Sequence, residues 1–189
     1  MKPLVRYILH NRLSIPIKDW EVQGFGFMRL RLDANTRLHI WDSRLRTPGV
    51  SDVHDHAQWG FTSHIISGNM VNIRYSVHTE HAPAGERHHM ATIECGVGGG
   101  MPKQDLKQVF LVPKPELYLP GDVYRQEPDE VHRTIARDGT VTIITQERTE
   151  VTTARVFWPL GGAWGDAIPR QATPAEVDEV GRFALSVFG

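Results

Sequence analysis

The chain has 189 residues, of which 40% are hydrophobic and 23% charged, with a formal net charge of -1; this fits one domain spanning residues 1–189. The near-neutral charge and the lack of a basic run give no electrostatic reason to expect nucleic-acid binding, and no stretch approaches the roughly 20 apolar residues that span a membrane. A single cysteine, Cys95, and no apolar leader after Met1 favour a cytoplasmic protein.

The first clear strand pattern begins at Gly24. Residues 1–20 are weakly patterned and predict a short helix or strand on the outside of the domain. From 25 to 32 large residues alternate between two faces, 33–36 carries turn residues, and 37–41 is extended again. This sequence predicts a β-hairpin.

Further short strands follow, separated by turn residues. Residues 79–104, which include a run of three glycines, and 159–172 predict loops. Many short strands with turn signals favour an all-β jelly-roll barrel with its core at about 24–158. The predicted strands cover residues 53–66, 69–78, 106–112, 117–119, 131–136, 140–148 and 151–158.

The C-terminus predicts the clearest helix, at about 174–188. Thr173 is suited to an N-cap, Pro174 to the first helical position, and Glu176 completes a capping box. Apolar residues then recur at helical spacing through Val187. We expect this helix to cover part of the barrel.

Histidines provide the strongest chemical signal. His54 and His56 flank Asp55 in a strand-like run, and side chains two apart on a strand share a face. Both imidazoles can therefore point into a barrel while Asp55 points away. His132, at the start of another predicted strand, is the best third ligand for a metal ion. The pair alone also fits two surface or hydrogen-bonded histidines.

The histidine segments resemble the two motifs of the cupin family. From His56 the chain runs four residues to Phe61 and six more to Gly68, as in the first motif, and 120–132 resembles the second with looser spacing. Most cupins have a metal-binding Glu where Phe61 stands. Three histidines without that Glu resemble the thiol dioxygenases, a cysteine dioxygenase-like group.

The resemblance extends to residues that would handle substrate. The 27–33 strand is similar to the thiol-dioxygenase strand whose Arg holds the substrate carboxylate, and Arg29 matches that Arg. The alternative is a solvated surface Arg beside Arg31. The family's Ser-x-His-x-Tyr element is replaced, with Ile144 and Gln146 in place of the His and Tyr.

These positions define the remaining site candidates. We count Gln146 as an active-site candidate together with Arg29 and Gln58; Gln58 shares the predicted face of the His pair, although a hydrogen bond to the backbone is equally compatible. Asp52 and Glu130, each two residues before a histidine, could orient a ligand or bind the metal themselves.

The resemblance implies a non-haem Fe(II) dioxygenase that uses O2 on a small carboxylate-bearing substrate, which includes thiols. Iron is the first expectation, with nickel or zinc as alternatives, because neutral imidazole suits all three. A homodimer is expected from the family. Two other hypotheses stay open, a metal-dependent lyase or isomerase and a non-catalytic cupin that binds a small molecule.

Overall fold

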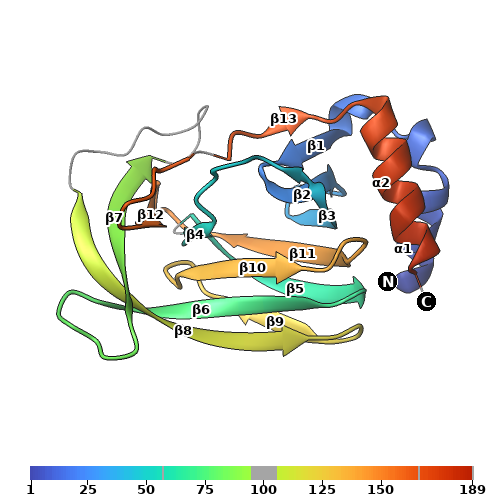
Figure 1. Ribbon diagram of the computed structural model, residues 1–189. Helices are drawn as coiled ribbons and strands as arrows, with labels where there is room; N and C mark the ends of the chain where they lie inside the picture. Colours follow the sequence, from blue (N-terminus) through green and yellow to red (C-terminus); the bar gives the residue numbers. More distant parts are fainter. Residues whose placement is uncertain (57, 95–105, 166, 189) are drawn as a thin grey trace.

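The computed structural model of the chain is β-rich, with a helix at each end, and describes residues 1–56, 58–94, 106–165 and 167–188 (Figure 1). Its strands form a closed six-stranded antiparallel barrel and a seven-stranded sheet. The predicted all-β barrel with a C-terminal helix is confirmed at this level. None of the helices in these ranges is long and apolar enough to cross a membrane.

Both ends of the chain meet at one end of the molecule. The N-terminal region forms α1 (Lys2–His10) and the short helices η1 (Arg12–Ser14) and η2 (Ile17–Asp19). The C-terminal helix α2 (Pro174–Ser186) ends two residues before the predicted boundary and begins with the expected capping box. The two α-helices lie side by side there, next to both termini (Figure 1).

The seven-stranded sheet contains the predicted hairpin, now β2 (Phe25–Arg31) and β3 (Thr36–Arg46). One face of the hairpin presents apolar residues such as Met28 and Ile40 to the core shared with α1 and α2. The opposite face carries Phe27 and Arg29 toward the candidate site. The sheet runs in the order β13 (Arg170–Gln171), β1 (Trp20–Gln23), β2, β3, β11 (Val141–Arg148), β5 (Trp59–Ser67) and β9 (Val123–Gln126).

The closed barrel joins strands that are far apart in the sequence. It runs in the order β10 (His132–Ala136), β4 (Val53–His54), β12 (Thr153–Pro159), β7 (Glu86–Glu94), β8 (Lys107–Tyr118) and β6 (Met70–His78), with β6 pairing back to β10. The strands β4 and β10 carry His54 and His132 of the candidate metal centre, and His56 follows β4.

Several predicted boundaries are wrong. Residues 79–104 are not one loop, because β7 lies within them and pairs with β8 and β12. Its strand pattern was hidden because only His88 and Ala91 of this strand are buried. Two predicted strands at 106–112 and 117–119 are the single strand β8. Its prolines, Pro113 and Pro115, lie beyond the part that pairs with β7, where β8 has only β6 as a neighbour.

Other predictions need smaller corrections. The predicted loop 159–172 contains β13, and β1 begins before the expected start of the core at Gly24. The segment 53–66, expected to form one or two strands, forms β4 and β5. Cys95 and the three glycines at 98–100 lie outside the described residues.

Candidate metal centre and basic cleft

Adjacent barrel strands bring the three predicted ligands together. His132 of β10 lies directly opposite His54 of β4 in the antiparallel pairing, and His56 follows in the turn before β5. The ring centroids of the three histidines are 4.6 to 5.2 Å apart. Their ligand atoms lie within 4.8 Å of one another, and the Nε2 atoms of His54 and His56 are 3.2 Å apart.

Strand alternation does not explain how His56 joins the cluster, because β4 ends at His54. The position of His56 is explained instead by the contacts of Asp55. Asp55 is 3% exposed, and its carboxylate accepts hydrogen bonds from the backbone N–H and the Nε of Arg155 on β12, at 2.8 and 2.5 Å. This anchor fixes Asp55 away from the cluster, as predicted, while the flanking imidazoles converge.

A backbone carbonyl orients the ring of His54. Its Nδ1 lies 3.1 Å from the carbonyl oxygen of Asp52, and a carbonyl only accepts hydrogen bonds, so Nδ1 carries the proton. The lone pair of the neutral ring is then on Nε2. The Asp52 carboxylate instead pairs with Arg46 and Arg133 at 2.6 and 2.9 Å. Asp52 therefore orients the ligand through its backbone, not through its side chain.

A relay of two buried amides orients His132. The Gln126 side-chain NH2 donates to the Glu130 carbonyl at 2.9 Å, and the Asn72 NH2 donates to Gln126 Oε1 at 3.0 Å. This leaves Asn72 Oδ1 to accept from His132 Nδ1 at 2.8 Å. His132 is 4% exposed, and its Nε2 has no hydrogen-bond partner in the described part of the chain.

Sequence reasoning missed Asn72 and Gln126. The only signal for Asn72 was its place on the polar face of the alternating 69–78 run. Glu130 takes part through its backbone carbonyl, while its carboxylate pairs with Arg74 at 2.9 Å. The structure therefore does not bring the Glu130 carboxylate into the ligand set.

The surroundings keep the three imidazoles neutral. Burial lowers the pKa of His54, and burial together with the neighbouring His54 holds the pKa of both His56 and His132 well below the usual 6.5. Neutral imidazole is the form that binds metal. Two nitrogens bound at about 2.1 Å to one ion would lie about 3.0 to 3.4 Å apart, which brackets the observed 3.2 Å. The cluster could hold a divalent ion.

Aromatic rings surround the cluster. Phe25 stacks on His54 with ring centroids 4.8 Å apart and nearly parallel planes. Phe61 lies edge-on to His56 at 5.5 Å and Trp59 lies 5.9 Å from the same ring. Because a phenyl ring cannot bind metal, the described residues at this centre offer three histidines as possible ligands.

The two predicted glutamines are placed differently. Gln146 is buried on β11, opposite Phe61 of β5. Gln58 lies in the turn before β5, not on the predicted strand face, and its backbone carbonyl accepts from the N–H of Thr149. No described hydrogen bond joins either glutamine side chain to the histidines, so their catalytic roles stay predictions.

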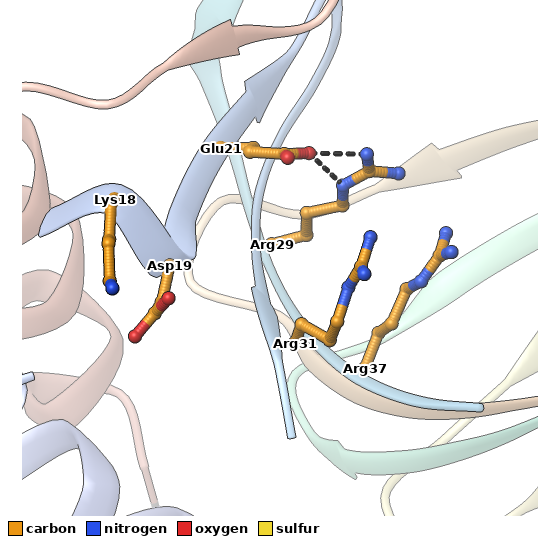
Figure 2. Close-up of a pocket in the computed structure, with 6 residues that line it drawn as sticks. All are labelled: Lys18, Asp19, Glu21, Arg29, Arg31 and Arg37. Atoms are coloured by element: carbon orange, nitrogen blue, oxygen red, sulfur yellow. Dashed lines mark hydrogen bonds and ion pairs between the residues drawn. The ribbon is translucent and has the colours of Figure 1, made fainter. Parts of the chain in front are cut away.

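A basic cleft lies beside β1, β2 and β3 (Figure 2). It has a volume of about 220 Å³ and is lined by Lys18, Asp19, Glu21, Arg29, Arg31 and Arg37. The carboxylate-binding role predicted for Arg29 stays a prediction, and in the structure Arg29 is paired with Glu21. Its Nε donates to the Glu21 carboxylate at 2.6 Å and its Nη2 pairs with the same oxygen.

Two other arginines in the cleft have no acidic partner among the described residues. Arg31 and Arg37 lie opposite each other on β2 and β3, and their guanidinium groups point the same way (Figure 2). Arg37 is 8% exposed, and burial together with Arg29 and Arg31 lowers its pKa to about 10.

Aromatic contacts connect the cleft to the histidines. The Arg37 guanidinium lies over the Trp59 ring at 5.6 Å, and Trp59 in turn lies against His56. Phe27 stacks on His39 at 4.4 Å. His39 is buried, and neither ring nitrogen has a hydrogen-bond partner in the described chain. The wall between the two sites thus carries one unsatisfied imidazole.

Comparison with known proteins adds no family: neither protein-family models nor curated proteins match this chain. Its function has to be argued from the cluster and the cleft.

Proposed function

We propose that the protein is a jelly-roll cupin enzyme, a non-haem Fe(II) dioxygenase that acts on a small carboxylate-bearing substrate, a class that includes thiols. The observation that carries this proposal is the convergence of three neutral imidazoles, two of them oriented by carbonyl-anchored hydrogen bonds that leave the proton on Nδ1 and the lone pair on Nε2. The resemblance of the histidine segments to the thiol dioxygenases supplies the reaction class.

His54, His56 and His132 would hold the ion, which would supply open coordination positions for substrate and O2. The side chains around them have separate tasks. Phe25 and Phe61 cover the imidazoles with apolar surface and so limit the access of water. The basic cleft attracts the acid group of the substrate and orients it.

The loss of the Ser-x-His-x-Tyr element shifts substrate orientation to other residues. Ile144 packs with Phe61 in an apolar cluster, so it cannot replace the hydrogen bonds of a histidine. Gln146 offers an amide that can donate or accept. We expect orientation to depend on Gln146 and on the cleft.

The test is iron reconstitution of the purified chain without oxygen, followed by oxygen uptake on a panel of small thiols and carboxylic acids. We expect uptake with at least one substrate, and none with His132→Ala under the same conditions. Full iron occupancy without oxygen uptake on any member of a broad panel would contradict the proposal.

One observation favours a second candidate, a metal-dependent lyase or isomerase. His39 is buried, and neither of its ring nitrogens has a hydrogen-bond partner in the described chain, so its open lone pair could receive a proton from a substrate. With the ion as a Lewis acid, proton transfer would need no oxygen. Turnover that continues without oxygen or with zinc in place of iron would select this candidate.

A further inference from the structure

Two arginines face each other across neighbouring strands, an arrangement of like charges that sheets normally avoid. Arg31 and Arg37 lie directly opposite each other across β2 and β3, and like charges in that position destabilise a sheet. Neither guanidinium has an ion pair or hydrogen bond within the described ranges. Most of the Arg37 side chain is buried, and its guanidinium opens onto the cleft beside Arg31. The arrangement calls for an anion between them.

We infer that the cleft is a binding site for a small dianion, such as a dicarboxylate or a phosphate group, with Arg31 and Arg37 as its contact residues. This rests on the proposed function only in assigning the dianion to the substrate. The anion site itself would exist whatever reaction takes place at the histidines.

The charge count argues for two negative charges. Three arginines face the cleft. Glu21 of β1 lies opposite one of them, Arg29 of β2, and neutralises its charge. Lys18 and Asp19 cancel each other and point away from the arginines (Figure 2). The excess is therefore two positive charges, which a single carboxylate would leave half compensated.

Size and position point to a small molecule bound near the metal centre. The cleft of about 220 Å³ is below the roughly 300 Å³ at which pockets for drug-sized ligands begin. Arg37 contacts Trp59, and Trp59 contacts His56, so one aromatic ring separates the Arg37 end of the cleft from the histidines.

Calorimetric titration of the full, metal-free chain tests the inference. The probes are succinate, butyrate as its singly charged counterpart of equal chain length, and inorganic phosphate. We expect succinate or phosphate to bind, and butyrate to bind at least about tenfold more weakly, since a charge-assisted contact is lost. Equal affinity for succinate and butyrate, or no binding of any probe, would overturn the inference.

Variants identify the contact residues. Arg31→Gln and Arg37→Gln should each weaken dianion binding about tenfold or more, whereas Arg182→Gln on the exposed face of α2 should leave it unchanged. Glu21→Gln should strengthen binding, because it releases Arg29. Arg31 and Glu21 are not fully buried, so these two variants remain informative if the buried Arg37 variant does not fold. Dianion binding that neither Arg31→Gln nor Glu21→Gln changes would count against the site.

The outcomes separate this inference from the proposed function. Dianion binding by a chain that takes up no iron would leave the inference standing and remove the dioxygenase. Iron binding and oxygen uptake without dianion binding by the metal-free chain would do the reverse.

Discussion

The ring nitrogen that carries the proton decides which nitrogen of each histidine can bind a metal. In His132 that choice is made 60 residues away in the sequence, by the amide of Asn72, and is passed on through Gln126 to a backbone carbonyl. Because the Glu130 carbonyl can only accept, every donor and acceptor along the relay is determined. The relay is therefore a structural reason for the free Nε2 of His132.

Replacing Asn72 tests the relay. Asn72→Leu removes the acceptor for His132 Nδ1, and we expect the affinity for zinc to fall by about 10- to 100-fold, the usual effect of losing a partner that orients a ligand. Thr134→Val is the matched control, since its hydroxyl contacts the same amide at 3.5 Å without touching an imidazole. Competition with a fluorescent chelator measures both. Unchanged affinity in a folded Asn72→Leu protein would show that the relay does not matter.

His39 predicts a pH dependence of stability. Its pKa is held well below 6.5 in the folded chain by burial, so below 6.5 the unfolded chain binds a proton that the folded chain does not. The stabilisation is complete above pH 6.5 and is lost as the pH falls below that value. In His39→Asn we expect the free energy of unfolding to fall less steeply with decreasing pH, by up to about 1.4 kcal/mol per pH unit. Urea unfolding of metal-free protein at several pH values measures this; equal slopes in the two proteins would contradict it.

At the scale of elements, the turn between β4 and β5 depends on its anchor to β12. We expect Asp55→Asn to lower the free energy of unfolding by about 2 to 3 kcal/mol, less than for a fully buried pair because Arg155 is partly exposed. Metal affinity should fall with it, since His54 and His56 flank the anchor. Glu147→Gln breaks an exposed pair with Arg125 and should cost less than about 1 kcal/mol. Urea unfolding measures both variants. Similar losses of unfolding free energy in Asp55→Asn and Glu147→Gln would argue against the anchor.

The capping box of α2 gives a prediction for the helical end. Thr173 accepts from the Glu176 N–H, and Glu176 accepts from the Thr173 N–H at 2.8 Å. Thr173→Ala should cost about 1 kcal/mol in the free energy of unfolding. Ser186→Ala, at the other end of the same helix, should cost less, because it removes only an exposed hydroxyl contact. The difference in thermal midpoint checks this, and equal midpoints would contradict it.

Elements with a local signal could be predicted from the sequence. The hairpin of β2 and β3 follows from alternation, and α2 from its cap and periodicity. The strand β7 could not be predicted, because its burial depends on pairing with β8 and β12, which follow later in the chain. The three histidines of the cluster could be singled out because their spacing resembles known motifs, and the structure brings them together. The partner of Arg29 could not be predicted, since Glu21 lies opposite Arg29 only because of the register of β1 and β2.

At the scale of the whole molecule, the barrel and the sheet contribute different halves of one site. The barrel strands β4 and β10 carry two of the histidines, and the sheet strands β2 and β3 carry the arginines. Trp59 of β5 links them through its contacts with His56 and Arg37. Under the proposed function, a metal at one end and an acid-binding group at the other would act on the same small molecule.

The claim on which this account depends is that His54, His56 and His132 share one metal ion. Elemental analysis of freshly purified protein beside His132→Ala, both checked for folding by circular dichroism, tests it most directly. We expect close to one divalent ion per chain in the unaltered protein and nearly none in the variant. Equal metal content in the two proteins, or none in the unaltered protein even after incubation with iron or zinc, would contradict the account.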